Sequence, residues 1–118
     1  MKKGLTTHIL DLTNGVPAQN VVVELWKIGE ESAERIFLSS AKTDEQGRID
    51  NDLLEQIDTG EYELLFHVGN YFQTMGTPLA KPIFFNRIAI RVALSSDNRH
   101  YHIPLLISPW GYQTYRGS

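Results

Sequence analysis

Short runs in which apolar and polar residues alternate, separated by turn residues, recur along almost the whole sequence. The clearest run is EYELLFHV, residues 61–68, which places Tyr62, Leu64, Phe66 and Val68 on one face of an extended strand. A chain with this period of two can bury its apolar residues only by pairing its strands into sheets. The alternation therefore limits the chain to a β-sheet fold with one face of each strand turned inward.

The other elements are predicted from β-branched runs and the turn residues between them. The predicted strands are residues 5–12, 20–28, 35–43, 61–68, 86–94, 100–108 and 110–115. Residues 50–59 are expected to be a short irregular segment. Residues 70–76 are expected to form one or two helical turns, with Asn70 as the N-cap and Gly76 as the stop. This spacing predicts an all-β fold, a two-sheet antiparallel β-sandwich of about eight strands with one short helix, in a single domain over residues 1–118.

Composition excludes several classes of function. The 118 residues are 42% hydrophobic and 21% charged, which is enough apolar material for a folded core. A net charge of −3 without any run of Lys or Arg argues against a nucleic-acid partner. No apolar stretch approaches the roughly 20 residues of a membrane-spanning helix, and Thr6, Thr7 and His8 interrupt any signal-peptide core. The absence of cysteine excludes disulfides, thiolate metal sites and cysteine nucleophiles, and it fits a cytoplasmic location.

Residues 100–108, HYHIPLLIS, depart from simple alternation. After Pro104, the residues Leu105, Leu106 and Ile107 are apolar on both faces. Since proline has no N–H to give to a ladder, we expect this strand to lie at a sheet edge or at a bulge. An apolar edge invites further pairing unless something covers it. We therefore predict a homo-oligomer whose contact includes this strand and the C-terminal segment.

The four histidines are the first candidates for chemistry. His67 falls on the polar face of a regular strand and is expected to be a solvated surface residue. His8, and the pair His100 and His102 on one face of their strand, could be satisfied polar residues, zinc ligands or groups that transfer protons. A zinc site would need a third and a fourth ligand, which no cysteine and no second His-x-His pair supplies.

An arginine near these histidines could hold a planar polar substrate or stabilise negative charge on oxygen. Arg48 follows the turn glycine Gly47, and Arg116 precedes Gly117. Either could serve, although an arginine beside a turn is usually only solvated. The sequence has no Gly-rich phosphate loop, no GxSxG elbow and no pair of carboxylates suited to glycoside hydrolysis.

Two segments at opposite ends of the chain resemble the signatures of a known family. LTTHILDLTNGVPAQNVVVELWKI, residues 5–28, and HYHIPLLISPWGYQTYRGS, residues 100–118, are similar to the two ends of the 5-hydroxyisourate hydrolases. These are the enzyme branch of the transthyretin-like proteins. GEYELLFHVGNYF in the middle is also similar, so that the resemblance covers nearly the whole chain. In that family the terminal YRGS separates the hydrolases from the hormone-carrying transthyretins.

The resemblance implies a transthyretin-like sandwich assembled as a homotetramer, a dimer of dimers, with its sites in the channel between dimers. It implies hydrolysis of the N1–C6 cyclic amide bond of 5-hydroxyisourate to 2-oxo-4-hydroxy-4-carboxy-5-ureidoimidazoline, a step of urate degradation, without a metal or another cofactor. The catalytic residues would be His8, Arg48, His102 and Ser118, and the substrate-binding residues would be Tyr115, Arg116 and Gly117. The C-terminal tail would then be pinned at the site instead of fraying into solvent.

Two other classes of function stay open at this point. The first is a non-catalytic carrier of small planar ligands built on the same sandwich, which the retained His8, Arg48, His102 and YRGS tail disfavour. The second is a structural or adhesion-type module, which the lack of linkers and of a secretion signal disfavours. Which histidine acts as general base is also left open.

Overall fold

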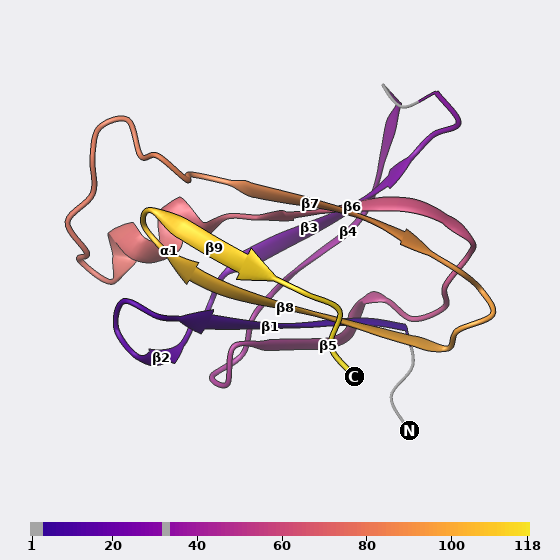
Figure 1. Cartoon of the computed structure of the whole chain (residues 1–118), viewed down its shortest axis with the longest axis horizontal. Coiled ribbons are helices and arrows are strands. Elements are labelled where there is room, and N and C mark those ends of the chain that lie inside the picture. Colours follow the sequence, from indigo (N-terminus) through magenta and orange to yellow (C-terminus); the bar gives the residue numbers. More distant parts are fainter. Residues whose placement is uncertain (1–3, 32–33) are drawn as a thin grey trace.

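The chain forms two β-sheets packed face to face, with one helix beside them (Figure 1). The computed structural model describes residues 4–31 and 34–118. In this part of the chain the elements are β1 (Gly4–Asp11), β2 (Val16–Pro17), β3 (Val22–Ile28), β4 (Arg35–Lys42), β5 (Arg48–Leu54), β6 (Gly60–Phe66), α1 (Val68–Thr74), β7 (Ile88–Leu94), β8 (His100–Ser108) and β9 (Gly111–Thr114). The predicted class, a two-sheet sandwich with one short helix, is confirmed.

The two sheets differ in how their strands are drawn from the chain. One sheet has the order β4-β3-β6-β7, and all its pairs are antiparallel. The other has the order β2-β1-β8-β9, with β5 also paired to β1. Within it β1 and β8 run parallel, which differs from the wholly antiparallel arrangement predicted. No hairpin joins these two strands, since they come from opposite ends of the chain, and so no local turn sets their relative direction.

The core lies between the sheets and follows the predicted alternation. Tyr62, Leu64 and Phe66 of β6 are at most 1% exposed, and Val23 and Leu25 of β3 are fully buried. The facing sheet contributes Leu5, Ile9, Leu105 and Ile107, all fully buried. The inward face predicted for residues 61–68 is therefore confirmed over β6, since side chains two residues apart share a face of a pleated strand.

β5 forms a strand over the first half of the segment, residues 50–59, that was predicted to be irregular, while residues 55–59 lie outside any strand. It pairs with β1 through Thr7↔Ile49 and His8↔Arg48. Its inward residues include Ile49 and Leu53, which are 2% and 3% exposed. The prediction was wrong for residues 50–54. Acidic residues on the outward side interrupt the apolar pattern there, and pairing with β1 stabilises a strand that the local pattern does not indicate.

The helix is shifted by two residues from its predicted place. α1 begins at Val68, with His67 at the N-cap position and without a side-chain cap, so Asn70 is inside the helix and is not its cap. Gly76 ends the helix as predicted, because it takes a φ of 73°, which favours glycine. In the described residues no helix is long and apolar enough to cross a membrane.

The sequence predicted a sheet edge or a bulge for residues 100–108. β8 lies inside its sheet, between β1 and β9, so the first of these alternatives was wrong. The ladder between β8 and β9 runs from Leu105 to Ser108 and resumes with a single bridge between His102 and Gly117. Pro104 lies in the gap between these pairs, where the β8–β9 ladder needs no backbone N–H donor from β8. β9 and the tail of the same chain cover β8. The homo-oligomer was predicted because β8 was expected to be an uncovered edge. That argument no longer holds, and the oligomer stays a prediction.

Candidate active site

Strand pairing brings the predicted site residues together on one face of the β2-β1-β8-β9 sheet. In the register of this sheet His8 of β1 is paired with Arg48 of β5 on one side and with Pro104 of β8 on the other. Thr6 is paired with His102. Since Leu5 and Ile9 of β1 point into the core, Thr6 and His8 belong to the opposite face. His8, Arg48 and His102 therefore lie on the sheet face that is turned away from the core.

The C-terminal tail returns to the same face after β9 ends at Thr114. The backbone N–H of Gly117 donates to the carbonyl of His102 at 2.8 Å. The guanidinium of Arg116 lies 4.6 Å from the centre of the ring of Tyr101, a core residue on the opposite face of β8, so this cation–π contact holds the tail from the other side of the sheet. In Figure 1 the yellow tail passes beside β8 and ends near β5. The tail is thus held against the sheet, in agreement with the prediction that it does not fray.

A pocket of about 410 Å³ lies where these elements meet. It is lined by His8, Leu10, Arg48, His102, Pro104, Leu106, Tyr115, Arg116, Gly117 and Ser118. The structure thus brings all seven predicted site residues to one pocket, although they come from β1, β5, β8 and the tail. Sequence reasoning missed its apolar walls, Leu10, Pro104 and Leu106. Their signal was present, because they continue the alternating face that carries His8 and His102.

A tight turn before β5 orients both Arg48 and His8. The Asp44 carboxylate accepts hydrogen bonds from the backbone N–H groups of Gln46 at 2.8 Å and Arg48 at 3.0 Å. These amides, first that of Arg48 and then that of Gln46, hold the pKa of Asp44 below its ordinary value of 3.8. The Gln46 carbonyl lies 2.8 Å from Nε2 of His8. Because a carbonyl only accepts, Nε2 carries a proton and Nδ1 is the nitrogen of His8 that can exchange one.

The histidine pair of β8 has a different arrangement. The His100 and His102 rings are stacked with centroids 6.4 Å apart, and Nδ1 of His102 lies 2.8 Å from the hydroxyl of Thr6. Over residues 4–31 and 34–118, no group of three or more His, Cys, Asp or Glu side chains is placed to hold a metal ion. Nε2 of His100 lies 3.0 Å from the same hydroxyl, so that Thr6 contacts both rings, an arrangement suited to proton transfer.

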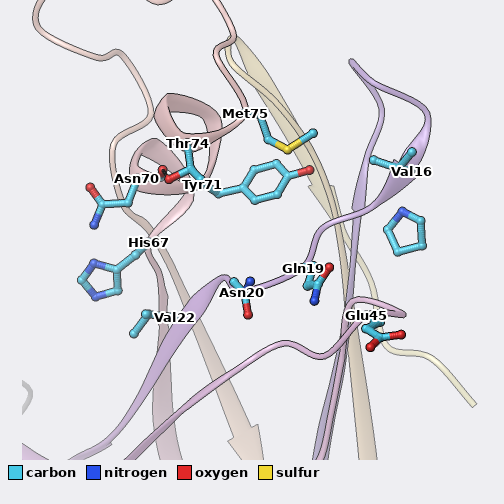
Figure 2. A pocket seen from close by; sticks show the side chains of 11 residues that line it. Val16, Gln19, Asn20, Val22, Glu45, His67, Asn70, Tyr71, Thr74 and Met75 are labelled. Carbon is cyan, nitrogen blue, oxygen red and sulfur yellow. Dashed lines mark hydrogen bonds between the residues drawn. The ribbon is translucent and has the colours of Figure 1, made fainter.

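A second pocket, also of about 410 Å³, lies between α1 and the segment around β2 (Figure 2). Figure 2 shows Tyr71 of α1 and Met75, the residue after it, on one side and Val16 and Glu45 on the other. None of the predicted site residues lines it. It therefore adds nothing to the site described above.

His67, at the rim of this second pocket, is not the solvated surface residue that was predicted. Its Nε2 is hydrogen-bonded to the Glu24 carboxylate of β3, and the two side chains are 20% and 21% exposed. The hydrogen bond from His67 is the main reason that the pKa of Glu24 is lowered, against the opposing effect of burial. The prediction failed because the pairing of β3 with β6 puts an acceptor beside the ring.

Fold and pocket together define a β-sandwich of the transthyretin class whose outer sheet face carries two histidines, an arginine and the chain terminus. The sequence profile of the HIUase/Transthyretin family matches residues 5–117, and the chain belongs to this family.

Relatives and solved structures agree with this assignment. The chain is 46% identical to 5-hydroxyisourate hydrolase of Halalkalibacterium halodurans, with 100% of both chains covered. It is 41% identical to 5-hydroxyisourate hydrolase 2 of Rhizobium meliloti, covering 97% of this chain and 95% of the relative. Klebsiella pneumoniae 5-hydroxyisourate hydrolase superposes with a TM-score of 0.81 at 35% identity, over 100% of both chains. Sea bream transthyretin in complex with thyroxine superposes with a TM-score of 0.84 at 26% identity, over 96% of this chain and 93% of that chain.

Proposed function

We propose that this protein hydrolyses 5-hydroxyisourate to 2-oxo-4-hydroxy-4-carboxy-5-ureidoimidazoline, opening the ring at the N1–C6 amide bond during urate degradation. The observation that carries the proposal is the convergence of His8, Arg48, His102 and the Tyr115–Ser118 tail on one pocket. Full-length relatives of 41% and 46% identity that are named 5-hydroxyisourate hydrolases support it.

Hydrolysis of a cyclic amide needs an activated water, a site for the oxyanion and a proton for the departing nitrogen. In the proposed mechanism neutral His102 takes the proton of the attacking water, and His8, which enters the step with protons on both nitrogens, delivers the one on Nδ1 to the leaving nitrogen. Exchange with solvent then removes the proton from His102 and returns one to His8. Arg48 binds the planar ring and stabilises the charge that develops on oxygen. By comparison with single oxyanion donors, this contact is worth roughly 3–4 kcal/mol in the transition state. The scheme uses no metal and no cofactor.

The tail completes the site in this proposal. Ser118 and its terminal carboxylate line the pocket together with Tyr115 and Arg116. Gly117 allows the close approach, since a Cβ at this position would lie 2.6 Å from Cδ2 of His102. The tail thus confines the substrate against the two imidazoles. Holding the reacting groups in position lowers the entropic part of the activation barrier.

The fold alone does not separate this enzyme from a carrier of planar ligands. Sea bream transthyretin superposes at least as well as the K. pneumoniae hydrolase, with TM-scores of 0.84 and 0.81. The side chains of the pocket make the difference, because two imidazoles and a guanidinium supply proton transfer and charge stabilisation that a carrier does not need.

One assay separates the two functions. The purified protein is mixed with urate and urate oxidase, and the decay of the 5-hydroxyisourate absorbance is followed. We expect strong acceleration over buffer, and we expect His102→Asn to fold and assemble normally while losing most of the activity. Decay at the buffer rate with the wild-type protein would eliminate the hydrolase.

We further propose a homotetramer, a dimer of dimers, in which each chain is one domain over residues 1–118. Support comes from Phe84 and Trp110, which are 65% and 63% exposed with ring centroids 5.7 Å apart, an apolar patch typical of subunit contacts. Light scattering should give the mass of four chains, and the mass of one chain at all concentrations would refute the assembly.

The lack of cysteine supports our placement of the protein in the cytoplasm, which cell fractionation can test.

A further inference from the structure

A buried hydroxyl connects the two histidines of β8. Thr6 is fully buried, and its Oγ1 lies 2.8 Å from Nδ1 of His102 and 3.0 Å from Nε2 of His100. The carbonyl of Tyr101 is a third neighbour at 3.4 Å. The arrangement follows from the register, which pairs Thr6 with His102 across the parallel β1–β8 contact, and from the spacing that puts His100 on the same strand face.

The hydroxyl has one hydrogen to give and can accept from the other neighbours. If it donates to His100 or to the Tyr101 carbonyl, Nδ1 of His102 must be the donor in its own contact with Thr6. Nε2 of a neutral His102 then has no proton and can take one from water. If the hydroxyl donates to His102, Nε2 carries the proton and His102 cannot act as a base there. The direction of one hydrogen bond thus decides whether His102 is a base.

We propose that Thr6 and His100 are positioning residues that hold His102 in the tautomer with Nδ1 protonated and Nε2 unprotonated, so that Nε2 can accept a proton. The inference rests on the proposed hydrolase function and assigns the general base that the sequence left open. His100 accepts the Thr6 hydrogen at Nε2, and Thr6 in turn accepts from Nδ1–H of His102. When His102 gains a proton at Nε2, the same contact stabilises the imidazolium, as an orienting group does in other histidine-dependent hydrolases.

The first test compares two substitutions at one position. Thr6→Val removes the hydroxyl at nearly constant volume, and Thr6→Ser keeps it. We expect Thr6→Val to lower kcat by about tenfold or more with KM changed by less than about threefold, and Thr6→Ser to stay within about threefold of wild type in both constants. Equal kcat values for Thr6→Val and wild type would overturn the proposal.

The second test reads the tautomer without any substrate. The ¹⁵N resonances of the His102 ring, assigned in the imidazole-labelled protein, report which nitrogen carries the proton. We expect a protonated Nδ1 in wild type and Thr6→Ser, and a shift toward a protonated Nε2 in His100→Phe, which removes the acceptor at the half-buried start of β8. A protonated Nε2 in wild type, or an unchanged tautomer in His100→Phe, would overturn the proposal even if Thr6→Val did not fold.

The two proposals fail separately. An inactive wild-type protein with Nδ1 of His102 protonated would reject the hydrolase and keep the hydrogen-bonded arrangement. An active wild-type protein with the opposite tautomer would keep the hydrolase and reject the role given to Thr6 and His100.

Discussion

Gly117 is the point at which the backbone of the tail comes closest to a proposed catalytic side chain. A Cβ built there would lie 2.6 Å from Cδ2 of His102, well inside normal contact, and 3.2 Å from Cγ of Pro104, which is tight. Its N–H also donates to the carbonyl of His102. Because Gly117 has no side chain, the tail can pass close to the imidazole and bring the terminal serine near it. The geometry of the pocket therefore depends on this glycine.

Gly117→Ala should therefore displace either the tail or the His102 ring. We expect kcat/KM to fall by about a hundredfold, because small displacements of reacting groups are costly, with little change in melting temperature. Gly111→Ala is the matched control, since a Cβ there would meet only the Ser108 hydroxyl at 3.8 Å. Equal activity of the two variants, measured by the 5-hydroxyisourate decay assay, would show that the close approach has no part in catalysis.

At the scale of elements, polar contacts fix how the helix and strands meet. Asp11, 1% exposed at the end of β1, accepts from the Tyr71 hydroxyl of α1 at 2.7 Å and from the backbone N–H groups of Thr13 and Asn14. Burial first, and then this hydrogen bond, raise the pKa of Tyr71 above its ordinary value. The contact therefore involves a neutral phenol that donates to a carboxylate, which joins α1 to the turn after β1.

Tyr71→Phe should lower the free energy of unfolding by about 1–2 kcal/mol, because the buried Asp11 carboxylate loses a donor while the ring still packs. Urea unfolding of this variant and of Tyr112→Phe, whose ring is 43% exposed, measures the difference. A loss in Tyr71→Phe no larger than in Tyr112→Phe would contradict the structural role of the hydroxyl.

The contact between Glu24 of β3 and His67 gives a pH dependence of defined sign. The pKa of Glu24 is lowered from its ordinary value of 4.5, mainly by the hydrogen bond from His67, so the stabilisation is present above that value. It is lost as the pH falls through the folded-state pKa. Glu24→Gln should therefore lower stability by about 0.5–1 kcal/mol at neutral pH and by nothing in strong acid. Denaturant midpoints of both proteins across this pH range test it, and a constant difference would count against the contact.

At the scale of the whole molecule, both ends of the chain meet in one sheet. β1 and β8 pair in parallel over their whole shared length, and the hydrogen bond between Thr6 and His102 spans 96 positions of sequence. β9 and the tail then cover β8 on its other side. Pocket assembly thus depends on the completed sheet, whereas most of the apolar core lies beneath it and does not involve the last residues.

Deleting residues 115–118 should consequently cost activity far more than stability. We expect kcat/KM to fall by about a hundredfold or more, since substrate loses one wall of its site, while the melting temperature changes by only a few degrees. Ser118→Ala, which keeps the terminal carboxylate, separates the serine hydroxyl from the rest of the tail. A deletion variant that melts much earlier but keeps its activity per folded molecule would assign the tail to stability alone.

Local backbone geometry made much of the fold readable from the sequence. A period of two places Tyr62, Leu64 and Phe66 on one face wherever their strand pairs, and these residues are buried as predicted. Most of the candidate site residues were likewise readable from the motifs at the two ends of the chain, whereas Arg48 was predicted from its place after the turn glycine Gly47. Prediction failed where the deciding partner was distant, as for β5, Pro104 and His67.

The sequence by itself determined which faces of the strands are apolar and which side chains with acid–base chemistry the chain carries. Only the tertiary structure decided that β1 and β8 run parallel, that Pro104 lies inside a sheet and that Thr6 lies between two imidazoles. The physical reason is that alternation is a property of a single extended backbone, whereas register and direction between strands some 96 positions apart arise from packing of the whole molecule.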